Sequence, residues 1–245
     1  MTGAAPGGEV VVVTGAARGL GHAITVELLK RGAQVVAGYS ADPAPLDLLA
    51  QKWSGQVWAI PGDIAEEATS LRLIKQACRL GGPTAVIHNA AISRDALLVR
   101  TKVEDWDEVQ RVNLRGAFLL SKHAVKAMMR TRNGRLVFIS SVSAVFGNSG
   151  QTSYAASKSG LEGLSRSISQ EYARFGIGTC VLAPGLINVG LGARLPAQYQ
   201  ETKAGRFLLG AAEAEEIAGI AAFLASPTAR HINATTVHAD GGGLF

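Results

Sequence analysis

Tyr154 and Lys158 are the residues whose types and spacing most directly suggest chemistry in this chain. They are four positions apart, so on a helix their side chains would share one face, one turn apart. A nearby lysine ammonium stabilises a phenolate and lowers the pKa of the phenol, which makes tyrosine a usable acid or base near neutral pH. The same spacing also occurs in ordinary surface pairs, so the rest of the chain has to decide between the two interpretations.

Two polar residues earlier in the chain could act with this pair. Ser141 follows the apolar segment 136–139, which has the composition of a buried strand. Ser140 is the competing candidate, because neighbouring residues of a strand point to opposite faces and only one hydroxyl can serve a site. Asn113 lies within an apolar helical segment, where a buried amide needs hydrogen-bond partners. Its structural alternative is an amide that bends the helix.

A glycine-rich segment near the N-terminus has the pattern of a nucleotide-binding turn. The valines at 10–13 form a continuous apolar run, which is typical of a strand buried on both faces. Gly15, Gly19 and Gly21 follow, and apolar residues then recur at helical spacing. Glycines allow close approach of the backbone, and a helix N-terminus offers free N–H groups to a pyrophosphate. The spacing is Gly-x3-Gly-x-Gly, not the commoner Gly-x-Gly-x-x-Gly, and the alternative is an ordinary strand-to-helix turn.

Strand and helix patterns alternate along the whole chain. We predict strands at 9–14, 33–39, 56–60, 84–89, 135–140, 177–183 and 235–239. We predict helices at 20–31, 45–54, 66–80, 103–131, 151–175 and 212–225. Such alternation predicts an α/β fold, a doubly wound parallel sheet of about seven strands with helices on both faces. No linker divides residues 1–245, so they are expected to form a single domain.

The segment 186–211 is long and irregular, and it follows Pro184 and Gly185. In such sheets ligands bind beyond the carboxyl ends of the strands, and long loops of compact domains are usually functional. We therefore predict a substrate lid near 186–211. The alternative is a loosely packed surface loop.

Composition narrows the class of protein. Hydrophobic residues make up 47% of the chain, yet no apolar stretch approaches the roughly 20 residues that span a bilayer. Residues 1–8 lack the features of a signal peptide. Cys78 and Cys180 fall in apolar-periodic segments and are expected to be reduced, buried thiols, which fits a cytoplasmic protein. The five histidines have no metal-ligand spacing, so no metal is predicted, and His88 at a strand end is expected to serve packing.

The formal net charge of +5 suggests an acidic partner. The chain has no Lys/Arg run, no nucleic-acid-binding motif and no platform of aromatic residues, which argues against nucleic acid. An acidic carrier protein or the phosphates of coenzyme A fit better. Arg130, Arg132 and Arg135 cluster near the end of a long helix, with Arg174 near the end of another. Basic residues there also simply favour the helix dipole.

Together these features resemble the short-chain dehydrogenase/reductase family, over nearly the whole chain. The matching motifs, in order, are Thr14-Gly15-x3-Gly19-x-Gly21, Asn89-Ala90-Ala91, Asn113, Ser141, Tyr154-x3-Lys158 and Pro184-Gly185. Within the family the chain is most similar to the β-ketoacyl-(acyl-carrier-protein) reductases, through segments 94–100, 147–151 and 240–242. The resemblance implies a Rossmann-type fold and an NADPH-dependent reduction of a 3-oxoacyl thioester, bound to carrier protein or coenzyme A, to the 3-hydroxyacyl form. Alternatives are a specialised reductase of a polyketide or aryl-polyene intermediate, and a non-catalytic cofactor-binding regulator.

The resemblance also assigns roles to residues. Tyr154 would donate a proton to the carbonyl oxygen, and Lys158 would lower its pKa and bind a ribose hydroxyl. Ser141, which the family's spacing to Tyr154 favours over Ser140, would orient the substrate oxygen. Asn113 would hold a water in a proton relay to the lysine.

The cofactor is expected to be NADP(H). An acidic residue after the second strand would bind the ribose 2′-hydroxyl of NAD, but positions 38–40 carry none. Arg18 can offer a guanidinium to a 2′-phosphate, and Asp63 resembles the family's adenine contact. The residues expected to bind cofactor are Gly15, Ala17, Arg18, Gly19, Leu20, Gly21, Tyr39, Ser40, Asp63, Ile64, Asn89, Ala90, Ala91, Tyr154, Lys158, Pro184, Gly185 and Ile187.

Two positions depart from the family pattern. Val189 stands where a threonine commonly bonds the nicotinamide carboxamide. Either Asn188 or a backbone group replaces that hydroxyl, or the cofactor is held more loosely. Ala91 stands where a glycine is usual.

The helices at 103–131 and 151–175 carry apolar residues on more than one face. Because the family packs these helices across a two-fold axis, a homotetramer is expected.

Overall fold

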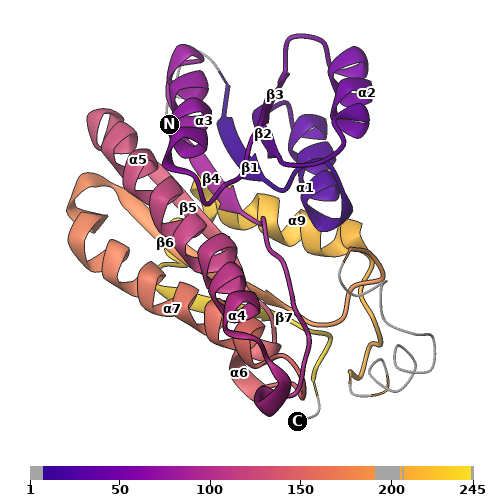
Figure 1. Cartoon of the computed structure of the whole chain (residues 1–245). Helices are drawn as coiled ribbons and strands as arrows, with labels where there is room; N and C mark the ends of the chain where they lie inside the picture. The colour runs from indigo at the N-terminus through magenta and orange to yellow at the C-terminus, as the bar shows by residue number, and fades with distance from the viewer. Residues whose placement is uncertain (1–7, 191–204, 206, 244–245) are drawn as a thin grey trace.

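The computed structural model describes residues 8–190, 205 and 207–243. These residues contain a seven-stranded sheet in the order β3-β2-β1-β4-β5-β6-β7 (Figure 1). All six strand pairs are parallel. The strands are β1 (Val10–Thr14), β2 (Gln34–Tyr39), β3 (Val57–Pro61), β4 (Ala85–His88), β5 (Gly134–Ile139), β6 (Ile177–Pro184) and β7 (Thr235–Ala239). The predicted fold class is confirmed, and every predicted strand is present to within one residue at each end.

Helices cover both faces of the sheet (Figure 1). One face packs against α1 (Gly19–Lys30), α2 (Ala44–Lys52) and α9 (Ala214–Ala225). The other face packs against α3 (Glu67–Arg79), α5 (Gly116–Thr131) and α7 (Thr152–Tyr172). None of the helices in the described part of the chain is long and apolar enough to cross a membrane.

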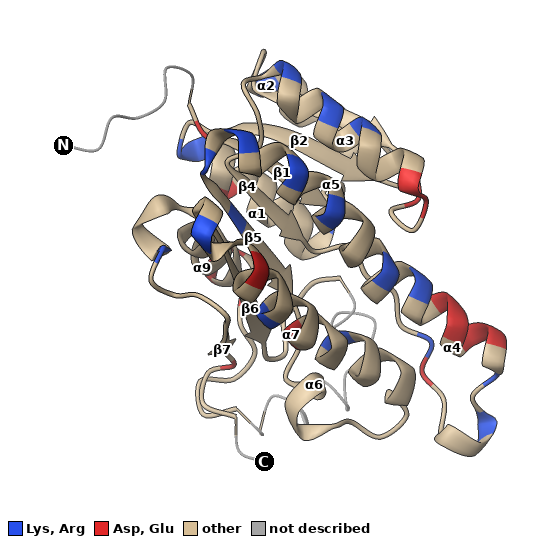
Figure 2. Ribbon diagram, turned by 90° about the vertical axis from the view of Figure 1, so that its left-hand side faces the viewer, with Lys and Arg blue, Asp and Glu red and all other residues tan. Residues whose placement is uncertain are grey.

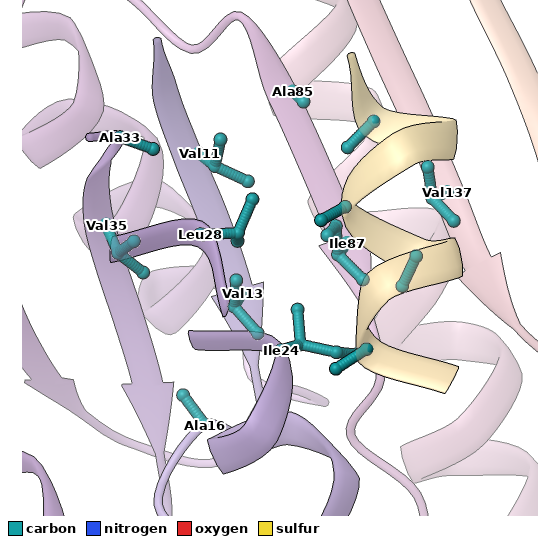
Figure 3. Packing of buried hydrophobic residues seen from close by; sticks show 14 of the residues in the cluster. Val11, Val13, Ala16, Ile24, Leu28, Ala33, Val35, Ala85, Ile87 and Val137 are labelled. Atoms are coloured by element: carbon teal, nitrogen blue, oxygen red, sulfur yellow. The ribbon is translucent and has the colours of Figure 1, made fainter. Parts of the chain in front are cut away.

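The valine run of β1 shows why both faces are covered. Val11 and Val13 point into the cluster that contains Ile24 and Leu28 of α1 (Figure 3). Val10 and Val12 belong to the cluster on the opposite face. Because side chains alternate along a strand, a continuous apolar run needs an apolar layer on each side.

The long predicted helix 103–131 is interrupted in its middle. It consists of α4 (Val103–Gln110), a π-helical turn η2 (Arg111–Arg115) and α5. Asn113 lies in this π turn, and single π turns inside helices are frequent at functional sites. The sequence pattern did not predict this turn, nor the short helices η1 (Leu98–Arg100), α6 (Ser143–Phe146) and η5 (Pro227–Ala229). The predicted helix 151–175 ends in a 3-10 turn, η3 (Ala173–Phe175).

Strand order brings the functional segments together. The chain places β2 and β3 on one side of β1 and then returns to place β4 on its other side. Ligands bind at such a switch point, outside the carboxyl ends of the strands. The glycine turn after β1 and the Asn89–Ala91 segment after β4 therefore meet there. Of the predicted lid at 186–211, residues 191–204 and 206 lie outside the described residues.

Two predictions about single residues were wrong. Cys78 on α3 is an exposed free thiol, whereas Cys180 on β6 is buried as expected. Arg135 is 5% exposed and does not belong to a surface cluster. Its Nε donates to the Leu224 carbonyl at 3.1 Å, and its Nη2 donates to the Ile232 carbonyl at 2.9 Å. The guanidinium therefore binds a carbonyl oxygen in the last turn of α9.

Candidate active site

A cleft of about 1220 Å³ lies over the carboxyl edge of the sheet, lined by residues at or just after the ends of strands β1 to β6. It is larger than most small-molecule pockets, which measure roughly 300–1000 Å³. Every predicted catalytic and cofactor-binding residue lines this cleft except Gly21 and Asn113. Those two residues are buried behind its wall.

The α7 helix presents Tyr154 to the cleft next to Ser141. The Ser141 hydroxyl acts on the phenol and lowers its pKa. The Ser141 hydroxyl also accepts the Ser143 N–H at 3.1 Å, in the short helix that follows β5. Ser140 is buried, and its hydroxyl donates to the Lys158 carbonyl at 3.2 Å. The structure therefore places Ser141, and not Ser140, beside the phenol.

Lys158 lies below Tyr154 on the same helix face. Its Nζ is 5.7 Å from the centre of the Tyr154 ring and donates to the Ile139 carbonyl at 2.6 Å. The lysine is 1% exposed, and this burial lowers its pKa to about 7.

The expected lowering of the Tyr154 pKa does not occur in this geometry. Desolvation raises the pKa of Tyr154 to about 12, and the hydrogen bond from Ser141 offsets only part of that effect. The reason is that the packed surroundings disfavour the phenolate more than nearby groups favour it. Tyr154 therefore carries its proton at neutral pH, as a proton donor must.

Asn113 is fully buried, and its side-chain amide makes three hydrogen bonds. Its Oδ1 accepts the Ile92 N–H at 2.9 Å, and its Nδ2 donates to the Ile92 carbonyl at 2.9 Å. The same Nδ2 donates to the Ser157 hydroxyl at 2.9 Å. The amide thus joins the segment after β4 to α7, directly beside Lys158.

The glycine turn fits a bound pyrophosphate. Gly15 and Gly19 have φ values of 65° and 54°, which favour glycine. A Cβ on Gly21 would overlap the Gly15 carbonyl oxygen and lie 2.5 Å from the Asn89 Nδ2. Arg18, the N-cap residue of α1, makes no side-chain capping bond. The first N–H groups of α1 are therefore available to an anion at the cleft.

The turn is held by a hydroxyl that the sequence analysis did not assign to the site. The Thr14 Oγ1 accepts the N–H groups of Asn89 and Ala90 at 3.1 and 3.0 Å. The Asn89 Nδ2 donates to the Thr14 carbonyl at 3.0 Å. The Thr14 side chain thus fixes the end of β1 relative to the end of β4. The position of this threonine directly before the glycine motif was the signal that could have predicted its role.

The far end of the cleft is lined by Tyr39 and Ser40 after β2 and by Asp63 after β3. The Asp42 carboxylate also lies there, but it accepts the Ala44 N–H at 2.9 Å. The Asp63 Oδ2 lies 2.7 Å from the Arg111 Nη2. Burial alone would raise the pKa of Asp63, but the Ala65 N–H and the Arg111 guanidinium outweigh it and leave the pKa below its ordinary value.

Four residues that line the cleft were not predicted as site residues: Asp95, Ser143, Asn148 and Gln151. Gln151 donates to the Asp95 carboxylate at 3.0 Å and accepts hydrogen bonds from Ser143 and Asn148 at 3.1 and 2.7 Å. All four line the cleft. Their only signal in the sequence was that three of them fall in the segments 94–100 and 147–151.

The two departures from the family pattern, Ala91 and Val189, both line the cleft. The Asn188 Nδ2 donates to the Glu213 carboxylate at 2.9 Å, so one of its N–H groups is already paired, and replacement of the threonine by Asn188 stays a prediction. A backbone group remains as the alternative.

Comparisons with known proteins show which sequences this chain resembles. A family model described as "Enoyl-(Acyl carrier protein) reductase" matches residues 15–243. The 3-oxoacyl-(acyl-carrier-protein) reductase FabG of Pseudomonas aeruginosa is 39% identical over 243 residues, covering 96% of this chain and 97% of the relative. The proteins of the same name from Thermotoga maritima and Escherichia coli are 37% and 38% identical, with the same coverage.

Proposed function

Because the chain belongs to the short-chain dehydrogenase/reductase family, we propose that it is an NADPH-dependent ketoreductase. Its substrate is a 3-oxoacyl thioester carried by acyl carrier protein or coenzyme A, and its product is the 3-hydroxyacyl form. The observation that carries this proposal is that Ser141, Tyr154 and Lys158 line one cleft, which continues to the glycine turn. The names of the similar proteins support the substrate class.

Reduction of a ketone requires a proton donor at the carbonyl oxygen. Bound NADPH would supply a hydride to the carbonyl carbon. The Ser141 hydroxyl hydrogen-bonds the oxygen and holds it near Tyr154, which donates its phenolic proton. The Lys158 ammonium stabilises the phenolate that remains and would hold a ribose hydroxyl of the cofactor. We assign Asn113 to the relay through its main-chain carbonyl, since both N–H groups of its amide are already donated and its Oδ1 accepts the Ile92 N–H.

Turnover of NADPH with a simple 3-oxoacyl thioester tests the function. We expect the absorbance of the reduced nicotinamide to fall at a rate proportional to enzyme. Activity confined to a polyketide or aryl-polyene ketone would favour the specialised reductase. Tight cofactor binding without turnover of any ketone would favour a regulator, and activity confined to sugars or steroids would overturn the substrate class.

We expect NADPH to give a higher kcat/KM than NADH. Arg18, Tyr39 and Ser40 line the end of the cleft where a 2′-phosphate would lie. Tyr39→Asp should shift the kcat/KM ratio toward NADH by about tenfold or more, because close like charges cost several kcal/mol. Tyr39→Asn is the uncharged control and should shift the ratio less. A wild-type preference for NADH of about tenfold would contradict this assignment.

The protein is proposed to be a homotetramer that places α5 and α7 across a two-fold axis. Phe118 of α5 is 48% exposed, whereas Ala117 of α5 and Leu161 of α7 are buried within the chain. Figure 2 shows acidic residues gathered on α4 and basic residues along α5. An antiparallel copy would bring these opposite charges together.

The proposed two-fold arrangement of protomers has a consequence for the docking of a carrier protein. Arg130 and Arg132 follow one another at the end of α5, just before β5 begins. Tyr154 lies at the opposite edge of the sheet, so the two arginines cannot flank the cleft of their own protomer. In an antiparallel two-fold pair they would approach the cleft of the partner.

Charge reversal of Arg130 and Arg132 to Glu should therefore raise KM for the carrier-bound substrate by about tenfold and leave a small thioester analogue nearly unaffected. Lys75→Glu on α3 is the matched control and should change neither. Light scattering should give the same oligomeric mass for the wild type, the double arginine variant and Lys75→Glu. Equal effects on both substrates would remove the docking role, and a monomeric wild type would remove the tetramer.

We also place the protein in the cytoplasm. The exposed thiol of Cys78 supports this assignment, because reducing compartments keep such thiols free.

A further inference from the structure

His88 is a buried titratable residue that the proposed mechanism does not use. It is the last residue of β4 and is 1% exposed. It lies between Thr14, which precedes the glycine turn, and Asn113 in the π turn. The sequence analysis assigned it to packing.

Hydrogen-bond chemistry determines which nitrogen of the imidazole carries the proton. The Nε2 lies 3.3 Å from the Asn113 main-chain oxygen. A carbonyl oxygen can only accept, so the Nε2 must donate. The Nδ1 lies 3.4 Å from the Thr14 Oγ1.

The hydrogen bonds of the Thr14 hydroxyl indicate that the Nδ1 of His88 carries no proton. The Thr14 hydroxyl already accepts two backbone N–H groups, from Asn89 and Ala90. A hydroxyl has one proton to donate, and this proton is left for the Nδ1 of His88. The Nδ1 is therefore an unprotonated acceptor, and the imidazole is neutral with its proton on Nε2.

The surrounding charges favour the neutral form. Burial, and then the charge of Lys158, lower the pKa of His88 to about 3. Lys158 of α7 is the charged group that acts on it, whereas β1 and the π turn present a hydroxyl and a carbonyl. A second positive charge beside the lysine would be unfavourable.

We propose that His88 is a positioning residue that couples the cofactor turn to the proton-handling groups. Its Nδ1 holds the Thr14 hydroxyl, and its Nε2–H holds the Asn113 carbonyl that serves Lys158. This role rests on the proposed reductase function, because the relay through Asn113 belongs to that function. A neutral imidazole with fixed hydrogen bonds at both ends sets the position of the carbonyl without adding a charge.

Three variants separate the two hydrogen bonds. The amide nitrogen of Gln can reach the position of the histidine Nε2, so His88→Gln retains a donor to Asn113. Asn reaches only the position of Nδ1, so His88→Asn retains the acceptor for Thr14 and loses the donor. His88→Leu loses both. His231→Gln, at an exposed position, is the control.

We expect His88→Asn to lower kcat by about tenfold or more with little change in KM, because a buried carbonyl loses its donor. His88→Gln should stay within about threefold of wild type. His88→Leu should also weaken NADPH binding in a fluorescence titration, because the Thr14 proton is left without an acceptor. If His88→Asn and His88→Gln have equal kcat values, the positioning role is overturned.

A second measurement is independent of turnover. The nitrogen-15 resonances of His88 in the wild-type protein should show a protonated Nε2, an unprotonated Nδ1, and no titration from about pH 5 to about pH 8. A proton on Nδ1, or titration in this range, would overturn the proposal even if the reductase activity is found. If no ketone is reduced but the tautomer is as expected, the proposed function fails, and the positioning role in catalysis fails with it.

Discussion

Tyr154→Phe is expected to lower kcat by about 10²–10⁴-fold, the usual loss when a positioned proton donor is removed. The substitution keeps the ring and removes only the hydroxyl on which Ser141 acts. The fold and the affinity for NADPH should therefore remain close to those of wild type. Steady-state kinetics with a 3-oxoacyl thioester and a fluorescence titration with NADPH measure the two effects separately.

Tyr172→Phe is the matched control for this experiment. Tyr172 is the last residue of the same helix, where it packs near Phe175 with ring centres 6.3 Å apart. Its loss of a hydroxyl should leave kcat unchanged. Turnover near the wild-type rate in Tyr154→Phe would show that another group donates the proton.

Gly21→Ala is expected to disrupt the cofactor turn. The new methyl group would overlap the Gly15 carbonyl oxygen, and no rotation of a side chain can relieve an overlap with backbone. Forced packing of this kind costs about 1–3 kcal/mol or more. We expect a fall in Tm of several degrees and a loss of NADPH affinity of about tenfold or more.

Gly219→Ala tests whether the position and not the substitution type matters. Gly219 lies within α9, where an added Cβ meets nothing within 4 Å. Alanine there should raise stability by about 0.5–1 kcal/mol, since glycine weakens helices. Unchanged NADPH affinity and Tm in Gly21→Ala would show that the turn can rearrange.

Much of the fold could be predicted because its signals are local. The valine run of β1 required apolar layers on both faces, and the structure supplies one with Ile24 and another with Leu73. The alternation of strands and helices then restricted the sheet to a parallel arrangement. The order of the motifs placed the glycine turn and Tyr154 at one edge of that sheet.

Other features depend on contacts that no local pattern records. The residue pattern of 103–131 is that of a continuous helix, and the π turn at Asn113 emerges only where the chain packs against Ile92 and Ser157. Likewise Arg135 reads as a basic surface residue, but β5 is a central strand and its guanidinium reaches α9.

The residue types and spacings by themselves determined the family, the sheet and the set of groups that could move a proton. The family's spacing already favoured Ser141 over Ser140, and the tertiary structure gives the physical reason, because the Ser140 hydroxyl is turned to the Lys158 carbonyl and Ser141 to Tyr154. It also decided the protonation states. Burial moves the pKa of Tyr154 to about 12 and that of Lys158 to about 7, and desolvation is a property of the packed surroundings that residue spacing does not contain.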